Sequence, residues 1–232
     1  TGTSSVGSSG RLALSTGDAT SGAGGAIAVL VGEGTTGDGG HISVVAGGTS
    51  ANAAQGGVVT IAAGEGTSVD AGNGGDGGTI SLIGGAALGT ALTDSGGRVQ
   101  IRGGASVTGR GGAVDVTTGA SAEGTSGELS LTSADAGEDG VSGDITLVTG
   151  VATGGTSGRI TLSSGAATGG AGGGVLLTIG DGDYYDGGDV RVTAGRTTAM
   201  AQKGGRVIVA GGEGASAHSS DGGNGGNVEL FG

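Results

Sequence analysis

Residues 97–119, GRVQIRGGASVTGRGGAVDVTTG, contain two copies of a short unit and the loop that joins them. Each copy begins with a glycine, which we number position 0. Aliphatic residues stand at positions 2 and 4, and a second glycine stands at position 7. The aliphatic pairs of these two copies are Val99/Ile101 and Val114/Val116.

The same unit recurs fourteen times along the chain, and all 28 residues at positions 2 and 4 are Val, Ile or Leu. Position 7 is glycine in twelve of the thirteen units that reach it, Ala134 being the exception. The leading glycines are Gly10, Gly25, Gly40, Gly57, Gly78, Gly97, Gly112, Gly127, Gly143, Gly158, Gly173, Gly188, Gly205 and Gly226. The other pairs are Leu12/Leu14, Ile27/Val29, Ile42/Val44, Val59/Ile61, Ile80/Leu82, Leu129/Leu131, Ile145/Leu147, Ile160/Leu162, Val175/Leu177, Val190/Val192, Val207/Val209 and Val228/Leu230.

Alternation with period two predicts one short strand in each unit. Residues two apart lie on the same face of an extended segment, and β-branched residues favour that conformation. No stretch has the spacing of an amphipathic helix, and glycine inside a helix costs about 1 kcal/mol. The glycines around each unit predict corners with positive φ or close backbone approach.

A second, longer period organises the units. Residues 1–84 align without a gap on residues 149–232, at an offset of 148. The chain is therefore predicted to be one continuous repetitive domain, 1–232, with a first nine-unit super-repeat over 1–148 and the start of a second over 149–232. Because the repeat stops within a unit at Phe231-Gly232, we expect the natural polypeptide to continue there.

Units with one half-buried strand must stack to share a core, which predicts an all-β fold. We expect a single β-solenoid, a parallel β-helix, with about 15 residues per coil and about 14 coils. The 28 aliphatic side chains should point inward, and Val114 should stack beside Val99 and Leu129. Two units per coil, forming two facing sheets, and an antiparallel meander are the alternatives.

Composition and charge restrict the partners. The chain has 64 glycines and no proline, which excludes collagen, and no cysteine, which excludes disulfides and thiolate metal sites. Nine basic residues against 21 acidic ones, a net charge of -12, argue against nucleic acid or an anionic membrane surface as partner. No apolar run is long enough to span a bilayer, so no membrane insertion is expected. O-linked glycans on the many Ser and Thr residues are chemically open.

No motif in the sequence predicts a catalytic residue, a cofactor-binding residue or a metal ligand. GEGTTG at 32–37 matches the dinucleotide fingerprint, but no helical pattern follows it, which favours a turn. His41 and His218 lie at unrelated places in the repeat and lack a nucleophile motif, so the chain is not expected to be an enzyme. Two acidic clusters favour solvated turns, with calcium as the alternative: Asp135, Glu138, Asp139 and Asp144, and Asp181, Asp183, Asp186 and Asp189 around Tyr184-Tyr185.

As a whole, residues 10–232 resemble the glycine-rich β-solenoid repeats of extracellular fibres, adhesins and surface coats. This resemblance implies a structural protein that forms or extends an extracellular or cell-surface filament, by end-to-end self-association or as part of a longer repetitive chain. Ice binding is one alternative, since a loop column of Thr and Ser residues runs along the repeat, interrupted by Val107 and Asp183. An adhesin stalk that binds carbohydrate or calcium is the other.

Overall fold

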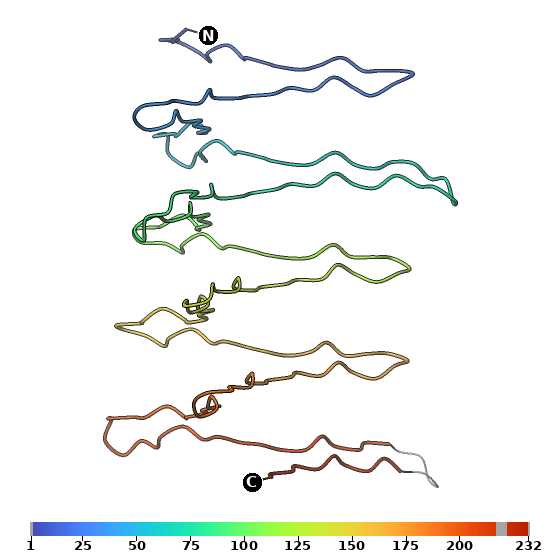
Figure 1. Ribbon diagram of the computed structural model, residues 1–232, viewed down its shortest axis with the longest axis vertical. Helices are drawn as coiled ribbons and strands as arrows, with labels where there is room; N and C mark the ends of the chain where they lie inside the picture. Colours follow the sequence, from blue (N-terminus) through green and yellow to red (C-terminus); the bar gives the residue numbers. More distant parts are fainter. Residues whose placement is uncertain (1, 217–221, 232) are drawn as a thin grey trace. The chain divides into compact units, whose positions relative to one another are not determined.

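The computed structural model describes residues 2–216 and 222–231, and it divides into two parts, Thr1–Thr117 and Thr118–Gly232. Within each part, extended segments alternate with bends, and Figure 1 draws neither a helix nor a strand. The bends lie between units, for example at residues 107–109 and 122–124. No helix in the described ranges has the length and apolarity to cross a membrane.

The predicted β-solenoid is wrong, and so are the facing-sheet and strand-meander alternatives, because the described residues contain no strand. None of these residues is buried, and the accessible surface is 22583 Å². A folded monomer of 20.9 kDa exposes about 9,000 Å² and its fully extended chain about 30,000 Å². The accessible surface is therefore close to that of an extended polypeptide, and residues 2–216 and 222–231 form no hydrophobic core.

The 28 paired aliphatic side chains, predicted to be buried, are all exposed, with between 49% and 92% of their surface open to solvent. The period of two is still visible as a difference in exposure. In the unit led by Gly25, Ile27 and Val31 at positions 2 and 6 are about half exposed, whereas Leu30 at position 5 is almost fully exposed. In this unit Ile27 and Val31 are thus better covered than Leu30, without being buried.

Successive units meet at their glycines, and we call each such contact a junction. At seven junctions the N–H of a leading glycine donates to the carbonyl of the position-7 glycine of the unit before it, as from Gly112 to Gly104 at 2.8 Å. The chain thus reverses in the intervening loop, which brings the start of one unit beside the end of the previous one. The other six bonds, of 2.7–2.9 Å, join Gly57 to Gly47, Gly78 to Gly64, Gly97 to Gly85, Gly127 to Gly119, Gly205 to Gly195 and Gly226 to Gly212.

Three junctions use a side chain instead of the backbone N–H. The hydroxyl at position 6 donates to the carbonyl of the next leading glycine, from Thr16 to Gly25 at 3.1 Å and from Ser164 to Gly173 at 2.7 Å. Thr149 makes the same bond to Gly158 at 3.4 Å. Position 6 is also the best covered in the chain: of the eight described residues that are only partly exposed, six stand there, namely Ala46, Ala63, Gly84, Thr118, Ser133 and Ala194.

This start-to-end contact is incompatible with the predicted parallel stacking, and the single bond at each junction is too little for an antiparallel ladder. Parallel stacking of Val114 beside Val99 and Leu129, as predicted, requires each unit to lie start beside start on its neighbours. The junctions instead set Gly112 beside Gly104 through one backbone bond, and the described segments make no second bond that would extend it into a ladder. A β-ladder needs repeated exchange along both segments, so the units remain extended but unpaired.

Crowding accounts for the leading glycine at several of the junctions. A Cβ added to Gly112 would lie 3.0 Å from the nitrogen of Gly104, and one added to Gly40 would lie 2.6 Å from Cγ1 of Val31. In contrast, a Cβ at Gly104, or at any of the other eleven position-7 glycines, would meet open space. The leading glycines are not at positive φ, so backbone conformation does not require glycine at these positions. Close approach does so at junctions such as those of Gly40 and Gly112, whereas a Cβ at Gly143 or Gly173 would make only ordinary contact.

Candidate functional site

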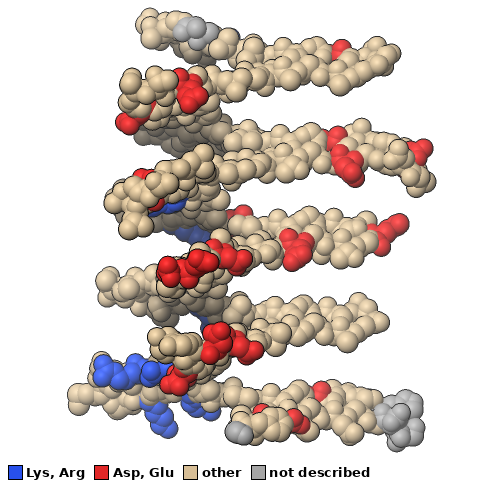
Figure 2. Space-filling view, in the orientation of Figure 1, with Lys and Arg blue, Asp and Glu red and all other residues tan. Residues whose placement is uncertain are grey.

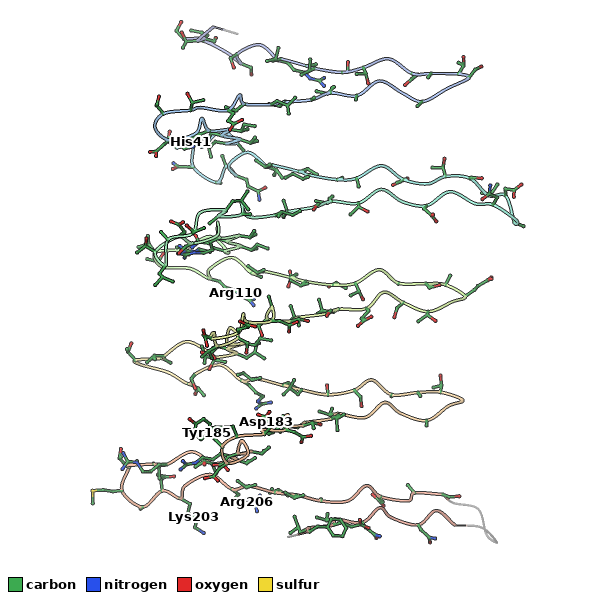
Figure 3. All side chains as sticks on the ribbon, in the orientation of Figure 1. His41, Arg110, Asp183, Tyr185, Lys203 and Arg206 are labelled. Carbon is green, nitrogen blue, oxygen red and sulfur yellow. The ribbon has the colours of Figure 1, made fainter. Side chains whose placement is uncertain are left out.

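The described residues enclose no pocket, and they contain no group of three or more His, Asp or Glu residues arranged to hold a metal ion. The candidate sites are therefore surface segments, which Figures 2 and 3 display by charge and as side chains.

The acidic cluster of Asp181, Asp183, Asp186 and Asp189 lies on an exposed loop that bends at residues 183–185. The rings of Tyr184 and Tyr185 pack edge to face, with centroids 4.9 Å apart and an interplanar angle of 84°. Figure 3 labels Asp183 and Tyr185 on this loop. The four carboxylates are presented to solvent along the loop and are not gathered around one point.

The second acidic cluster surrounds a tight turn at residues 138–139, closed by a 3.0 Å hydrogen bond from the N–H of Gly140 to the carbonyl of Gly137. Asp135, Glu138, Asp139 and Asp144 are all exposed, and they too form no group arranged for a metal ion. Both clusters are therefore exposed, acidic loop segments.

GEGTTG at 32–37 forms a bend at 35–37, with Gly37 at a φ of 84°, and no helix follows it. The anion site of the dinucleotide fingerprint needs the N-terminus of a helix, so this segment is a turn. His41, labelled in Figure 3, is exposed and has no hydrogen bond or ion pair to the described residues. His218 lies outside the described residues.

The loop column of Thr and Ser residues lies on no strand in the described part of the chain. Ice binding was considered because such a column could lie on a rigid sheet, and the described chain has no strand to form one. Thr35 and Thr153 each lie in a bend between extended segments.

One charged feature was missed by the sequence interpretation. Arg191, Arg196, Lys203 and Arg206 lie in a stretch of 23 residues, 190–212, that contains no acidic residue. All four are exposed, and no ion pair joins them to the described acidic residues. Figure 2 shows Lys and Arg gathered in one region, where Figure 3 labels Lys203 and Arg206. We call residues 190–212 the basic segment. Its signal in the sequence is the absence of Asp and Glu between Asp189 and Glu213, which the net charge of -12 conceals.

Comparison with protein-family models, with curated proteins and with solved structures found no match to this chain.

Proposed function

We propose that this protein is a structural, self-associating component of an extracellular or cell-surface filament and that its role involves no catalysis. The observation that supports this most directly is the absence of any buried residue in the described ranges, combined with a regular row of 28 exposed aliphatic side chains. The extended units leave their apolar surface and backbone hydrogen-bonding groups open for contact with other chains.

Exposed apolar surface in this amount favours association. Covering apolar area stabilises by about 25 cal/mol per Å², or about 1.5–3 kcal/mol for one fully buried Val, Leu or Ile side chain. Extended segments with unpaired N–H and C=O groups also accept further strands along their edges. Because the chain has fourteen such units, a partner that covers all of them would contribute this stabilising free energy at each unit.

The repeat itself favours a second copy of the chain as that partner. A partner has to present apolar side chains at the spacings of these units, which run 15, 15, 17 and 21 residues from Gly10 and again from Gly158. Another copy carries the same units at the same spacings. The net charge of -12 then limits sideways clustering of the assembled filaments.

Electron microscopy of the purified protein tests this proposal, together with sedimentation velocity over a hundredfold range of concentration. We expect thin, long filaments and a rise in mass with concentration. The variant Ile101→Asp with Leu147→Asp should abolish assembly, because it places two carboxylates in the apolar row. The control variant Leu88→Asp with Leu92→Asp, in the loop after the fifth unit, should assemble normally. A monomer at every concentration would contradict the proposal.

A further inference from the structure

Three cations of the basic segment lie around one junction. The N–H of Gly205 donates to the carbonyl of Gly195 at 2.9 Å, which closes the loop between them. Arg196 directly follows Gly195, Arg206 directly follows Gly205, and Lys203 stands two residues before Gly205. The backbone bond therefore brings the three positions together at the base of one loop, although they are separated along the chain.

Residues 195–206, which we call the basic loop, present these charges without a partner in the described chain. Arg196, Lys203 and Arg206 are exposed, and no ion pair joins them to the described acidic residues. Figure 3 labels Lys203 and Arg206 on this loop, and Figure 2 shows Lys and Arg gathered in one region. Like charges held around one loop repel each other, so a ligand that brings counter-charges is favoured there.

The same loop occurs without these charges in the first copy of the repeat. Residues 47–57 are closed by the corresponding bond, of 2.8 Å, and both loops contain a left-handed alanine at the same place. Gly48, Gln55 and Val58 stand where the basic loop has its three cations. The loop backbone therefore does not need the cations, which points to a role for them outside the chain.

We propose that the basic loop binds a linear anionic polysaccharide, a polymer of sugars that carry carboxylate or sulfate groups. Arginine pairs with carboxylates and with tetrahedral oxyanions through parallel N–H donors, and lysine supplies a point charge. Three cations around one loop match a short stretch of such a polymer. The inference adds an attachment site to the proposed structural role and does not depend on self-association, because the loop is complete in one copy of the chain.

The surroundings of the basic loop favour this partner over other polyanions. Asp189 precedes the basic segment, Glu213 follows it, and both are exposed. A flat anionic surface such as a membrane would meet these carboxylates, whereas a flexible linear polymer can cross the loop alone. Single-stranded nucleic acid gains affinity by stacking on aromatic rings, and residues 190–212 contain no aromatic residue.

Binding of two defined polymers to the full chain tests the proposal. Heparin carries sulfate and carboxylate groups, and polygalacturonate carries carboxylate groups only. We expect at least one of them to bind at low salt, measured by the fluorescence anisotropy of labelled oligosaccharides, and to be released in about 0.5 M salt. The variant Arg196→Gln with Lys203→Gln and Arg206→Gln should raise the Kd about tenfold, the combined effect of three exposed ion pairs.

A matched control separates the basic loop from a general effect of charge. Arg11→Gln with Arg98→Gln and Arg159→Gln removes the same charge, but from position 1 of three separate units. This control should bind the polymer as the wild type does. Equal weakening in the two triple variants would overturn the proposal, because net charge alone would then account for binding.

Transfer of the cations to the first copy gives a second test. Gly48→Arg with Gln55→Lys and Val58→Arg places them on a loop closed in the same way, and a Cβ at Gly48 would meet open space. This variant should bind one more oligosaccharide per chain than the wild type. No gain in stoichiometry, no binding of either polymer by the wild type, or equally tight binding of phosphatidylserine vesicles or oligo(dT) would overturn the proposal. Absence of filaments would contradict the proposed function only.

Discussion

Residues 1–84 and 149–232 contain the same repeat pattern at an offset of 148. Comparing them shows which features of the junctions are kept in both copies and which residues differ. The contacts repeat at an offset of 148: Gly57 bonds to Gly47 as Gly205 bonds to Gly195, and Thr16 bonds to Gly25 as Ser164 bonds to Gly173. A left-handed alanine also recurs, Ala53 with a φ of 56° and Ala201 with a φ of 59°.

The cations of the basic segment do not repeat. Residues 190–212 carry four cations, whereas the aligned residues 42–64 carry none; Ser43 and Val58 stand where the second copy has Arg191 and Arg206. Four other charged positions keep their sign in both copies: Arg11 and Arg159, Glu33 and Asp181, Asp38 and Asp186, and Glu65 and Glu213. Changes at junctions should therefore act equally in both copies, and changes to the four cations should act in one only.

The largest effect is expected at a leading glycine. Gly57→Val and Gly205→Val should each destabilise their junction by about 1–3 kcal/mol, because the new side chain collides with position 6 and position 7 of the previous unit. Amide hydrogen exchange at the substituted residue should become about tenfold to a hundredfold faster. The controls Gly47→Val and Gly195→Val, whose Cβ would meet open space, should change exchange much less. Unequal effects in the two copies would contradict a shared junction.

A smaller effect is expected from the hydroxyl at position 6. Thr16→Val and Ser164→Ala each remove one hydrogen bond, which is worth about 1 kcal/mol. The carbonyl ¹³C resonances of Gly25 and Gly173 should shift, with the larger change at Gly173, where the bond is shorter. Thr20→Val, in the following loop, serves as the control. No shift at either glycine would show that the hydroxyls do not hold these junctions.

The smallest effect concerns the left-handed alanines. Ala53→Gly and Ala201→Gly should each stabilise their bend by about 0.5 kcal/mol. Glycine removes the cost of the left-handed conformation but loses more chain entropy on ordering. NMR couplings of residues 51–54 and 199–202 should report a more uniform bend in each case. Destabilisation in either copy would show that the alanine side chain contributes a contact there.

Much of the local structure followed from the sequence, and the packing did not. The period of two at Ile27 and Val29 indicated an extended segment, and extended segments are present. The same pattern cannot say whether two segments meet start beside start or start beside end, because both keep the aliphatic row intact. That choice is made at Gly104 and Gly112, through one backbone bond in a reversing loop.

Two further features are visible in the sequence itself: the restricted set of residues at position 6 and the cations of the basic segment. Position 6 is always Gly, Ala, Ser, Thr, Val or Ile, as in Gly103, Thr118 and Ile179, and side chains at this position lie against the next leading glycine at several junctions. The cations of the basic segment, such as Arg191, were visible as a run without Asp or Glu.

The short span of each junction also has a kinetic consequence. The backbone bonds at the junctions close loops of only 8 to 14 residues, as between Gly104 and Gly112 or between Gly64 and Gly78. Loops of about ten residues close in roughly 10–100 ns, and the cost of closing them does not depend on the rest of the chain. Each turn is thus a separate event, so a chain emerging gradually from a narrow pore can form its turns one after another without waiting for its other end. In a single-molecule pulling experiment, we expect a gradual extension with many small steps and no single cooperative rupture.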